Sequence, residues 1–337
     1  MTSCLRYTEG PDHELGMTSG RALPVPYTGK SEYCYSNSLH MVLSANPVTG
    51  WSIPSPGRLE CLSTMPFGEL FLKGPRGLEF FLSPANTNPD LAVDLALDAL
   101  GWTCQTFIGS SDTTPREALR RLQSATEHGP ALVGPLNLGG LVQNPRAKYL
   151  RGGDHFVVAY AVDQEGVTFN DPFGFPHTWI PAPAFLRAWN VGRRGYWRGP
   201  FTVRWNFRPA KPATPRQAIR RTMPRVREAL LADPGGPVAF GSLAALDQLR
   251  DQARKGLPPE LRETLVYFSL PLGARRRLDA ADFADDAGRS SLADLFREQS
   301  QVLGRSQFAA VCHRDREFAR YVEQFRGVEE QVITSLR

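Results

Sequence analysis

Three residues far apart in the sequence carry the side chains that nucleophilic catalysis requires: Cys34, His155 and Asp171. A cysteine attacks a carbonyl carbon as the thiolate, an imidazole takes up and returns the proton, and a carboxylate holds the imidazole in one tautomer. Each residue alone also has an ordinary interpretation: a buried thiol, a strand-edge histidine and an aspartate in a turn. Together, in this order, they predict a thiol–imidazole–carboxylate site.

Cys34 stands directly before the first segment with helical periodicity, 36–45. The N-terminal end of a helix presents free N–H groups and the positive end of the helix dipole, and both stabilise a thiolate. We therefore expect a reactive thiolate at the start of this helix. The position of Cys34 fits a small buried apolar residue about equally well.

His155 opens the strongest strand signal of the chain, which is followed by a turn and a returning strand, at 155–162, 163–166 and 167–170. Such a hairpin brings the start of its first strand beside the end of its second. Asp171, which follows the second strand, is therefore expected to lie within reach of the imidazole.

Attack on a carbonyl carbon also needs hydrogen-bond donors for the oxyanion that forms. The backbone N–H of Cys34, at the helix start, is expected to supply one donor. The second is expected from Tyr27, Ser31 or Asn37, and the sequence does not decide among them.

The elements that position these residues predict an α+β fold, because helices lead the chain and strands dominate after residue 130. The helix over 89–100 has Asn88 as its N-cap and Gly101 as its stop, and a second helix spans 114–124. Further strands are expected at 102–108, 131–135 and 201–207.

A proline-rich segment, 209–215, is the best linker in the chain. Beyond it the apolar spacing is helical, with helices expected to begin at Pro215 and at Pro224. The sequence thus predicts two domains, 1–208 with the catalytic residues and 209–337 composed of helices. Other helical periodicity lies at 243–255, 290–304 and 313–334.

Composition excludes several classes of protein. The 337 residues are 42% hydrophobic and 22% charged, as in ordinary globular chains, and no apolar stretch is long enough to span a membrane. The net charge of +5 comes without a nucleic-acid-binding motif, and neither a zinc nor a nucleotide motif is present. We expect no metal, no cofactor, and neither nucleic acid nor membrane as a partner. Five scattered cysteines and no visible secretory signal favour reduced thiols in the cytoplasm.

The Cys34 segment, the HFVV strand and the Asp-Pro pair sixteen residues after His155 resemble the papain-like peptidase domains that process bacteriocin leaders. More specifically, the Cys34 segment, the stretch 61–72 and the proline-rich break before the helical part resemble the butirosin-biosynthesis protein H family. This resemblance covers 25–207 well and the helical part loosely. It implies a papain-like catalytic domain.

The resemblance further implies a cysteine acyltransferase of specialised-metabolite (antibiotic) biosynthesis. Such an enzyme moves an acyl group from the phosphopantetheine thioester of an acyl carrier protein to a small-molecule amine. Phosphopantetheine is then present only as part of the substrate, and the helical domain covers or shapes the acceptor pocket. Two alternatives stay open: a thiol hydrolase or peptidase that uses water, and a non-catalytic binding protein on the same fold.

One departure bears on this choice. Papain-like peptidases place a glutamine shortly before the nucleophile to complete the oxyanion hole, whereas here no glutamine precedes Gln105. The departure weakens the case for peptide hydrolysis more than for thioester exchange, since a thioester is already activated.

Arginine clusters are the candidates for carrier binding, because carrier proteins are acidic and present a phosphate. The candidate residues are Arg193, Arg194, Arg220 and Arg221. The ordinary alternative is a solvated helix face. Among other residues, His40 is expected to be structural and His177 to lie in an exposed loop, while the thiols expected to pack in the interior are Cys61, Cys104 and Cys312.

Overall fold

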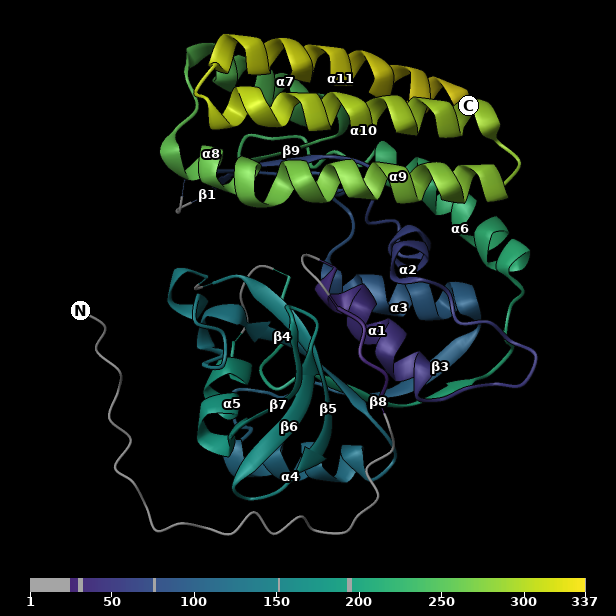
Figure 1. Cartoon of the computed structure of the whole chain (residues 1–337), viewed down its shortest axis with the longest axis vertical. Helices are drawn as coiled ribbons and strands as arrows, with labels where there is room; N and C mark the ends of the chain where they lie inside the picture. The colour runs from purple at the N-terminus through teal and green to yellow at the C-terminus, as the bar shows by residue number, and fades with distance from the viewer. Residues whose placement is uncertain (1–24, 30–32, 75–76, 151, 193–195, 337) are drawn as a thin grey trace.

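A six-stranded antiparallel sheet organises the first half of the chain (Figure 1). The computed structural model describes residues 25–29, 33–74, 77–150, 152–192 and 196–336. Along the sheet the strands follow the order β3 (Trp102–Phe107), β8 (Val203–Pro209), β4 (Ala131–Asn137), β5 (Asp154–Val162), β6 (Gly166–Asp171) and β7 (Phe175–Pro181).

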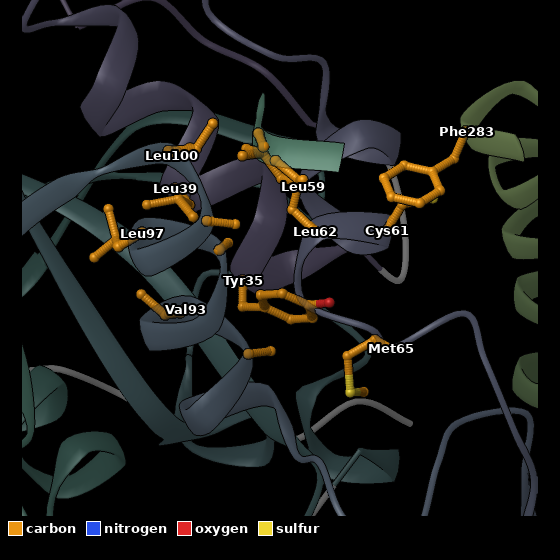
Figure 2. Packing of buried hydrophobic residues seen from close by; sticks show 14 of the residues in the cluster. Tyr35, Leu39, Leu59, Cys61, Leu62, Met65, Val93, Leu97, Leu100 and Phe283 are labelled. Atoms are coloured by element: carbon orange, nitrogen blue, oxygen red, sulfur yellow. The ribbon is translucent and has the colours of Figure 1, made fainter. Parts of the chain in front are cut away.

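Helices cover both faces of this sheet, and the central strands are therefore apolar on both sides. One face packs against α1 (Cys34–Ser44), which in turn packs against α2 (Pro56–Leu62) and α3 (Pro89–Leu100). The other face packs against α4 (Pro115–Thr126) and α5 (Ala182–Trp189). Figure 2 shows the cluster around α1, in which the labelled side chains include Tyr35, Leu39, Leu59, Leu62, Val93 and Leu97, with Phe283 of α9 at its edge.

Local sequence signals explain several of these boundaries. The Asn88 side chain accepts hydrogen bonds from the backbone N–H groups of Asp90 and Leu91, and Gly101 ends α3 in the left-handed conformation. The bounds expected for this helix are confirmed. The connection between β4 and β5 contains the short 3-10 turns Leu138–Gly140 and Ala147–Tyr149.

The second half is helical, as expected. It comprises α6 (Pro215–Leu230), α7 (Ser242–Lys255), α8 (Pro259–Thr264), a π-helical turn at Leu265–Ser269, α9 (Leu270–Asp286), α10 (Ser290–Val311) and α11 (Asp315–Ser335). The mixed fold with antiparallel strands and a helical C-terminal part is therefore confirmed. Within the described ranges, no helix combines the length and the apolar character needed to cross a membrane.

A small second sheet joins the two halves. The hairpin of β1 (Leu70–Gly74) and β2 (Gly77–Phe81) pairs with β9 (Ala239–Gly241), so that β1 lies between a neighbour in sequence and a strand far along the chain. This hairpin was not predicted. It lies against α7 and α8 of the helical half.

The expectation that a new helix begins at Pro224 is wrong, because α6 runs through that residue. A proline inside a helix removes one backbone hydrogen bond and disfavours the helix. Here the apolar residues Ala218, Ile219, Val226 and Ala229 lie on both sides of it and are all buried in one cluster with α3. Their continuous burial stabilises the unbroken helix.

Candidate active site

His155 and Asp171 form a buried hydrogen-bonded pair. Nε2 of His155 lies 2.7 Å from Oδ1 of Asp171, and both side chains are almost fully enclosed. His155 comes from the start of β5 and Asp171 from the end of β6, which pair as an antiparallel hairpin. The predicted proximity is confirmed. Since Nε2 faces the carboxylate, Nδ1 is the ring nitrogen left to exchange a proton with a substrate or nucleophile.

Two further donors hold the Asp171 carboxylate. The backbone N–H of Phe173 donates to Oδ1 at 2.8 Å, and Nε2 of Gln143 donates to Oδ2 at 2.8 Å. Burial works against the charged form of Asp171, but the imidazole of His155 and these hydrogen bonds outweigh it and hold its pKa below the usual value. Asp171 is therefore an ionised carboxylate that fixes the orientation of the imidazole.

Cys34 is the first residue of α1, and its thiol lies against the start of β5. The backbone N–H groups of Phe156 and Tyr35 face the sulfur, and Phe156 directly follows His155 in the strand. One helical turn later, Ser38 Oγ donates to the carbonyl oxygen of Phe156 at 3.1 Å. Among the described contacts, no hydrogen bond joins the sulfur to the imidazole. The sulfur is thus placed beside the residue that follows His155.

The expected thiolate is the part of the prediction that the structure corrects. The position at a helix start is confirmed, but burial, and then the charges of Asp154 and Glu60, raise the pKa of Cys34 well above its usual value. The two N–H groups at the sulfur lower it only in part. A chemical step at Cys34 therefore needs a base to remove the proton, and the start of β5 carries two candidates, Asp154 and His155.

The oxyanion candidates are used differently from one another. The hydroxyl of Tyr27 donates to the carbonyl oxygen of Asp171 and accepts from Gly174 N–H, both at 3.1 Å. Because its only proton is used in this bond, Tyr27 ties its segment to the turn after β6 and is not the expected oxyanion donor. Asn37, one helical turn after Cys34, is buried, and its Nδ2 has no hydrogen-bond partner among the described residues. Ser31 lies outside the described residues.

Three residues at the site were not predicted: Gln143, Asp154 and Tyr196. Burial and the charge of Asp154 raise the pKa of Tyr196 well above its usual value, and the nearby Cys34 adds to this effect. Asp154 directly precedes His155, and this adjacency was the only sequence signal for it. Gln143 lies in an irregular loop, in which no periodicity indicates its position.

The four arginine candidates for carrier binding divide into two groups. Arg193 and Arg194 lie outside the described residues. Arg220 is exposed on α6, and the exposed Arg221 donates from one guanidinium nitrogen to the carbonyl oxygen of Ala99 at 3.3 Å. Arg198, which follows the first pair in the sequence, has a structural contact with Asp90.

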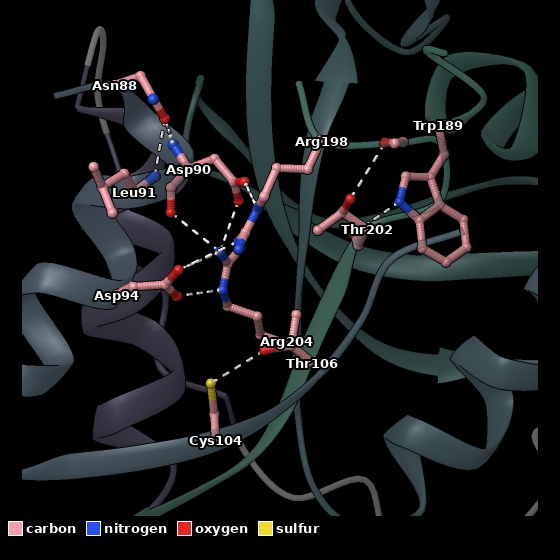
Figure 3. Close-up of polar contacts among 11 residues, drawn as sticks. Asn88, Asp90, Leu91, Asp94, Cys104, Thr106, Trp189, Arg198, Thr202 and Arg204 are labelled. Carbon is pink, nitrogen blue, oxygen red and sulfur yellow. Dashed lines mark hydrogen bonds and ion pairs between the residues drawn. The ribbon is translucent and has the colours of Figure 1, made fainter. Parts of the chain in front are cut away.

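Figure 3 shows the structural use of Arg198, which lies with the fully buried Arg204 against two aspartates of α3. Arg198 Nε lies 2.5 Å from Asp90, and Arg204 lies 2.7 Å from Asp90 and 3.0 Å from Asp94. These pairs fix α3 to β8 and to the segment before it. Buried ion pairs of this kind are costly to break from one side only.

The remaining titratable residues largely follow expectation. His40 contacts the Pro54 carbonyl oxygen at 2.9 Å. His177 is exposed as expected, but it lies in strand β7 and not in a loop, because the segment after Asp171 pairs with β6; its Nδ1 lies 2.7 Å from the Tyr160 hydroxyl. Cys61 is buried as expected, whereas Cys104, also expected in the interior, is only partly buried because it lies on β3, an edge strand of the sheet. Cys312 was expected to pack in a helix but is exposed, because α10 ends at Val311 and Cys312 is its C-cap. Among the described residues, no group of three or more histidine, cysteine or acidic side chains could hold a metal ion.

Comparison with known proteins relates the chain to YobF. Residues 236–337 match the family model named YobF C-terminal domain, a region that takes in β9 and α7 to α11. Over 290 residues the chain is 28% identical to "Uncharacterized protein YobF" of Bacillus subtilis (strain 168), which covers 85% of this chain and 88% of that protein. The similarity therefore extends across both halves of the chain.

Proposed function

We propose that the protein is a papain-like cysteine acyltransferase, which moves an acyl group from a carrier-protein thioester to an amine. The observation that carries the proposal is the buried His155–Asp171 pair at the start of the strand against which the Cys34 thiol lies. A nucleophile, a base and an orienting carboxylate at one place are the parts that covalent acyl transfer needs.

In the acylation step, Nδ1 of His155 removes the proton of the Cys34 thiol. The sulfur then attacks the thioester carbonyl, and a bond from Cys34 Sγ to the acyl carbon replaces the bond to the carrier thiol. The imidazolium returns its proton to the departing carrier thiolate. In the second step an amine attacks the acyl-enzyme, His155 takes the proton from the amine nitrogen, and the same proton restores the Cys34 thiol as the amide leaves.

Both steps pass through an oxyanion, for which α1 offers donors. The backbone N–H of Cys34 lies in the first turn of the helix, where N–H groups lack helical partners. The unpartnered amide nitrogen of Asn37 is one turn further along. We assign these two groups to the oxyanion, because Tyr27 is committed to Asp171.

The proposed donor is an acyl carrier protein, and the phosphopantetheine arm enters as substrate and not as a cofactor of this chain. The exposed arginines Arg220 and Arg221 on α6 are the proposed contact for the acidic carrier. Because the reaction needs a free thiol, the proposal places it in a reducing compartment, the cytoplasm. The proposed setting is the assembly of a specialised metabolite.

Mass spectrometry of the intact protein tests the proposal. Incubation with a small acyl thioester should add one acyl group, and Cys34→Ala should remove the adduct while the exposed Cys312→Ser variant keeps it. Addition of an amine should then release the acyl group as amide. Release as carboxylic acid, at a rate that amines do not change, would instead identify a hydrolase, and an adduct that persists in Cys34→Ala would reject both.

A further inference from the structure

We propose that α9, in the helical half, positions the nucleophile and sets the charge around it by holding the first turn of α1. This inference rests on the proposed function, because it treats Cys34 as the reacting group. Helix α2 lies against both α1 and α9, so that the C-terminal half reaches the start of α1 directly and through α2 (Figure 1).

The direct contact is made by Tyr33, the residue before Cys34. Tyr33 is fully buried, and its hydroxyl donates to Oδ2 of Asp279 at 2.5 Å. The guanidinium of Arg275 stacks over its ring, 4.3 Å from the centroid. Tyr33 is also the N-cap residue of α1, and its side chain does not cap the helix. Two side chains of α9 therefore hold the residue from which the helix starts.

The indirect contact passes through Glu60 of α2. Ser36, in the first turn of α1, donates to Oε1 of Glu60 at 2.8 Å. Arg276 of α9 approaches Oε2 of the same carboxylate at 2.9 and 3.0 Å and also donates to the carbonyl oxygen of Leu82. All three side chains are buried. The order Arg276–Glu60–Ser36 thus links α9 to the nucleophile helix without an intervening solvent contact.

Close packing at α2 supports this connection. A Cβ atom on Gly57, in the first turn of α2, would lie 2.2 Å from Oδ1 of Asp279, so that a larger residue there would push this carboxylate away. Asp279 therefore faces both Gly57 and the hydroxyl of Tyr33. A side chain at position 57 would therefore displace the carboxylate that the Tyr33 hydroxyl contacts.

The charges in this connection act on the thiol with opposite signs. Glu60 raises the pKa of Cys34, and Arg276 offsets the charge of Glu60. Other titratable or charged groups also lie around the start of α1: Asp154 and His155 on β5, Tyr35 on α1, and Tyr196. Arg275 and Asp279 of α9 contact Tyr33, the residue before Cys34. Removing Glu60 or Arg276 should therefore move the reactivity of Cys34 in opposite directions, whereas a purely structural role would move both in the same direction.

The test measures alkylation of Cys34 by iodoacetamide against pH, followed by peptide mass spectrometry, in the full-length protein. The exposed Cys312 serves as an internal reference thiol in each sample. Glu60→Gln should shift the Cys34 profile to lower pH by about one unit and Arg276→Gln to higher pH by a similar amount. The double variant should return close to the wild-type profile. Arg276→Lys, which keeps the positive charge, should shift the profile less than Arg276→Gln does.

The matched control is Arg262→Gln, which removes a partly buried ion pair of the same half. Arg262 contacts Asp315 at 2.8 Å and the carbonyl oxygen of Ala310, both away from α1. It should leave the Cys34 profile unchanged. The proposal is overturned if Glu60→Gln and Arg276→Gln shift the profile in the same direction or behave like Arg262→Gln.

Two measures keep the test decisive. If Arg276→Gln does not fold, Glu60→Gln alone must still shift the profile to lower pH, or the inference fails. Acyl transfer is assayed separately on the same samples. Opposite shifts in a protein without transfer activity would reject the proposed function and retain the control of Cys34 by α9. Transfer activity with no shift of the Cys34 profile would support the proposed function and reject the control of Cys34 by α9.

Discussion

Gln143 donates a hydrogen bond from Nε2 to Oδ2 of Asp171 at 2.8 Å, on the side of the carboxylate opposite to His155. The bond makes the loop between β4 and β5 part of the candidate site, because it fixes the carboxylate that in turn fixes the imidazole. A loop without regular structure therefore contributes to positioning the proposed base.

Gln143→Ala should lower kcat for acyl transfer by about tenfold with little change in KM, because a hydrogen bond to a charged group is worth about 1.5–3 kcal/mol. Asp171 would keep His155 and Phe173 as donors, so that the triad would weaken and not collapse. Steady-state kinetics with a small acyl thioester measure this effect. An unchanged kcat would show that Gln143 has only a structural role in the loop.

Cys34→Ala should abolish acyl transfer and leave the circular dichroism spectrum unchanged, since the loss of one buried sulfur atom leaves the core around α1 in place. Cys34→Ser should retain a trace of activity at most, because a hydroxyl is a much poorer nucleophile in this setting. Full activity in the alanine variant would contradict the assignment of the nucleophile.

Asp171→Asn should lower kcat by about 10³–10⁴-fold, because the imidazole loses its orienting charge and tautomer. The same variant tests the ionisation of Asp171. Its pKa in the folded protein is held below the value of 3.8 expected in the unfolded chain, so its contribution to the free energy of unfolding is present above that pH and is lost as the pH falls further. Urea denaturation from pH 5 down to pH 3 should therefore show a weaker decline in stability for Asp171→Asn than for the wild type.

Two buried carboxyl groups, one just before β1 and the other on α11, should produce the opposite pH dependence. Glu69 and Glu329 are fully buried, and in the part of the chain that the structure describes the one cation that offsets their charge is Arg277, which pairs with Glu69. Burial raises the pKa of both groups, further supported at Glu69 by the charge of Glu329. The stability that these two carboxyl groups contribute is present below pH 4.5 and is lost as the pH rises through their pKa values in the folded protein.

Glu329→Gln should therefore increase the free energy of unfolding at pH 8 by about 1–3 kcal/mol and have little effect at pH 4. The Arg277–Glu69 pair remains, and the new amide can still meet Gln299, which now contacts Glu329 at 2.5 Å. Urea denaturation at the two pH values measures the effect. Equal destabilisation at pH 4 and pH 8 would show instead that the Glu329 carboxylate is stabilised by its hydrogen bonds and by Arg277.

Charge reversal on α6 tests carrier docking. Arg220→Glu should raise the apparent KM for an acyl carrier protein several-fold and spare the reaction with a small acyl thioester, because only the carrier presents an acidic surface. Arg320→Glu, at an exposed position of α11, is the control. A similar effect of Arg220→Glu on both donors would argue against docking at this helix.

Much of the candidate site could be predicted because its geometry is local. A single hairpin brings His155 and Asp171 together, and alternating apolar residues with a turn between them are enough to indicate that hairpin. Likewise, the first apolar helix of the chain places Cys34 at its start. These inferences required only neighbouring residues.

The remainder depends on residues that only the folded chain brings together. The raised pKa of Cys34 comes from enclosure and from Glu60 on another helix, neither of which the spacing around Cys34 reveals. Proline usually starts or breaks a helix, but at Pro224 the burial of the residues on either side overrides this local rule. Strand β1 pairs with β9, about 170 residues away, and no local propensity specifies that pairing.

The pairing of β1 with β9 has a practical consequence for dissecting this protein. Cleavage between β8 and α6, at 210–214, would separate the β1–β2 hairpin from its third strand, β9, and Glu60 from Arg276. The amino-terminal fragment would then expose a bare strand edge, a common cause of aggregation, and would leave the Glu60 carboxylate unneutralised near Cys34. Although the sequence divides into two regions, the chain should be expressed whole. The role of each half is best studied by point substitution.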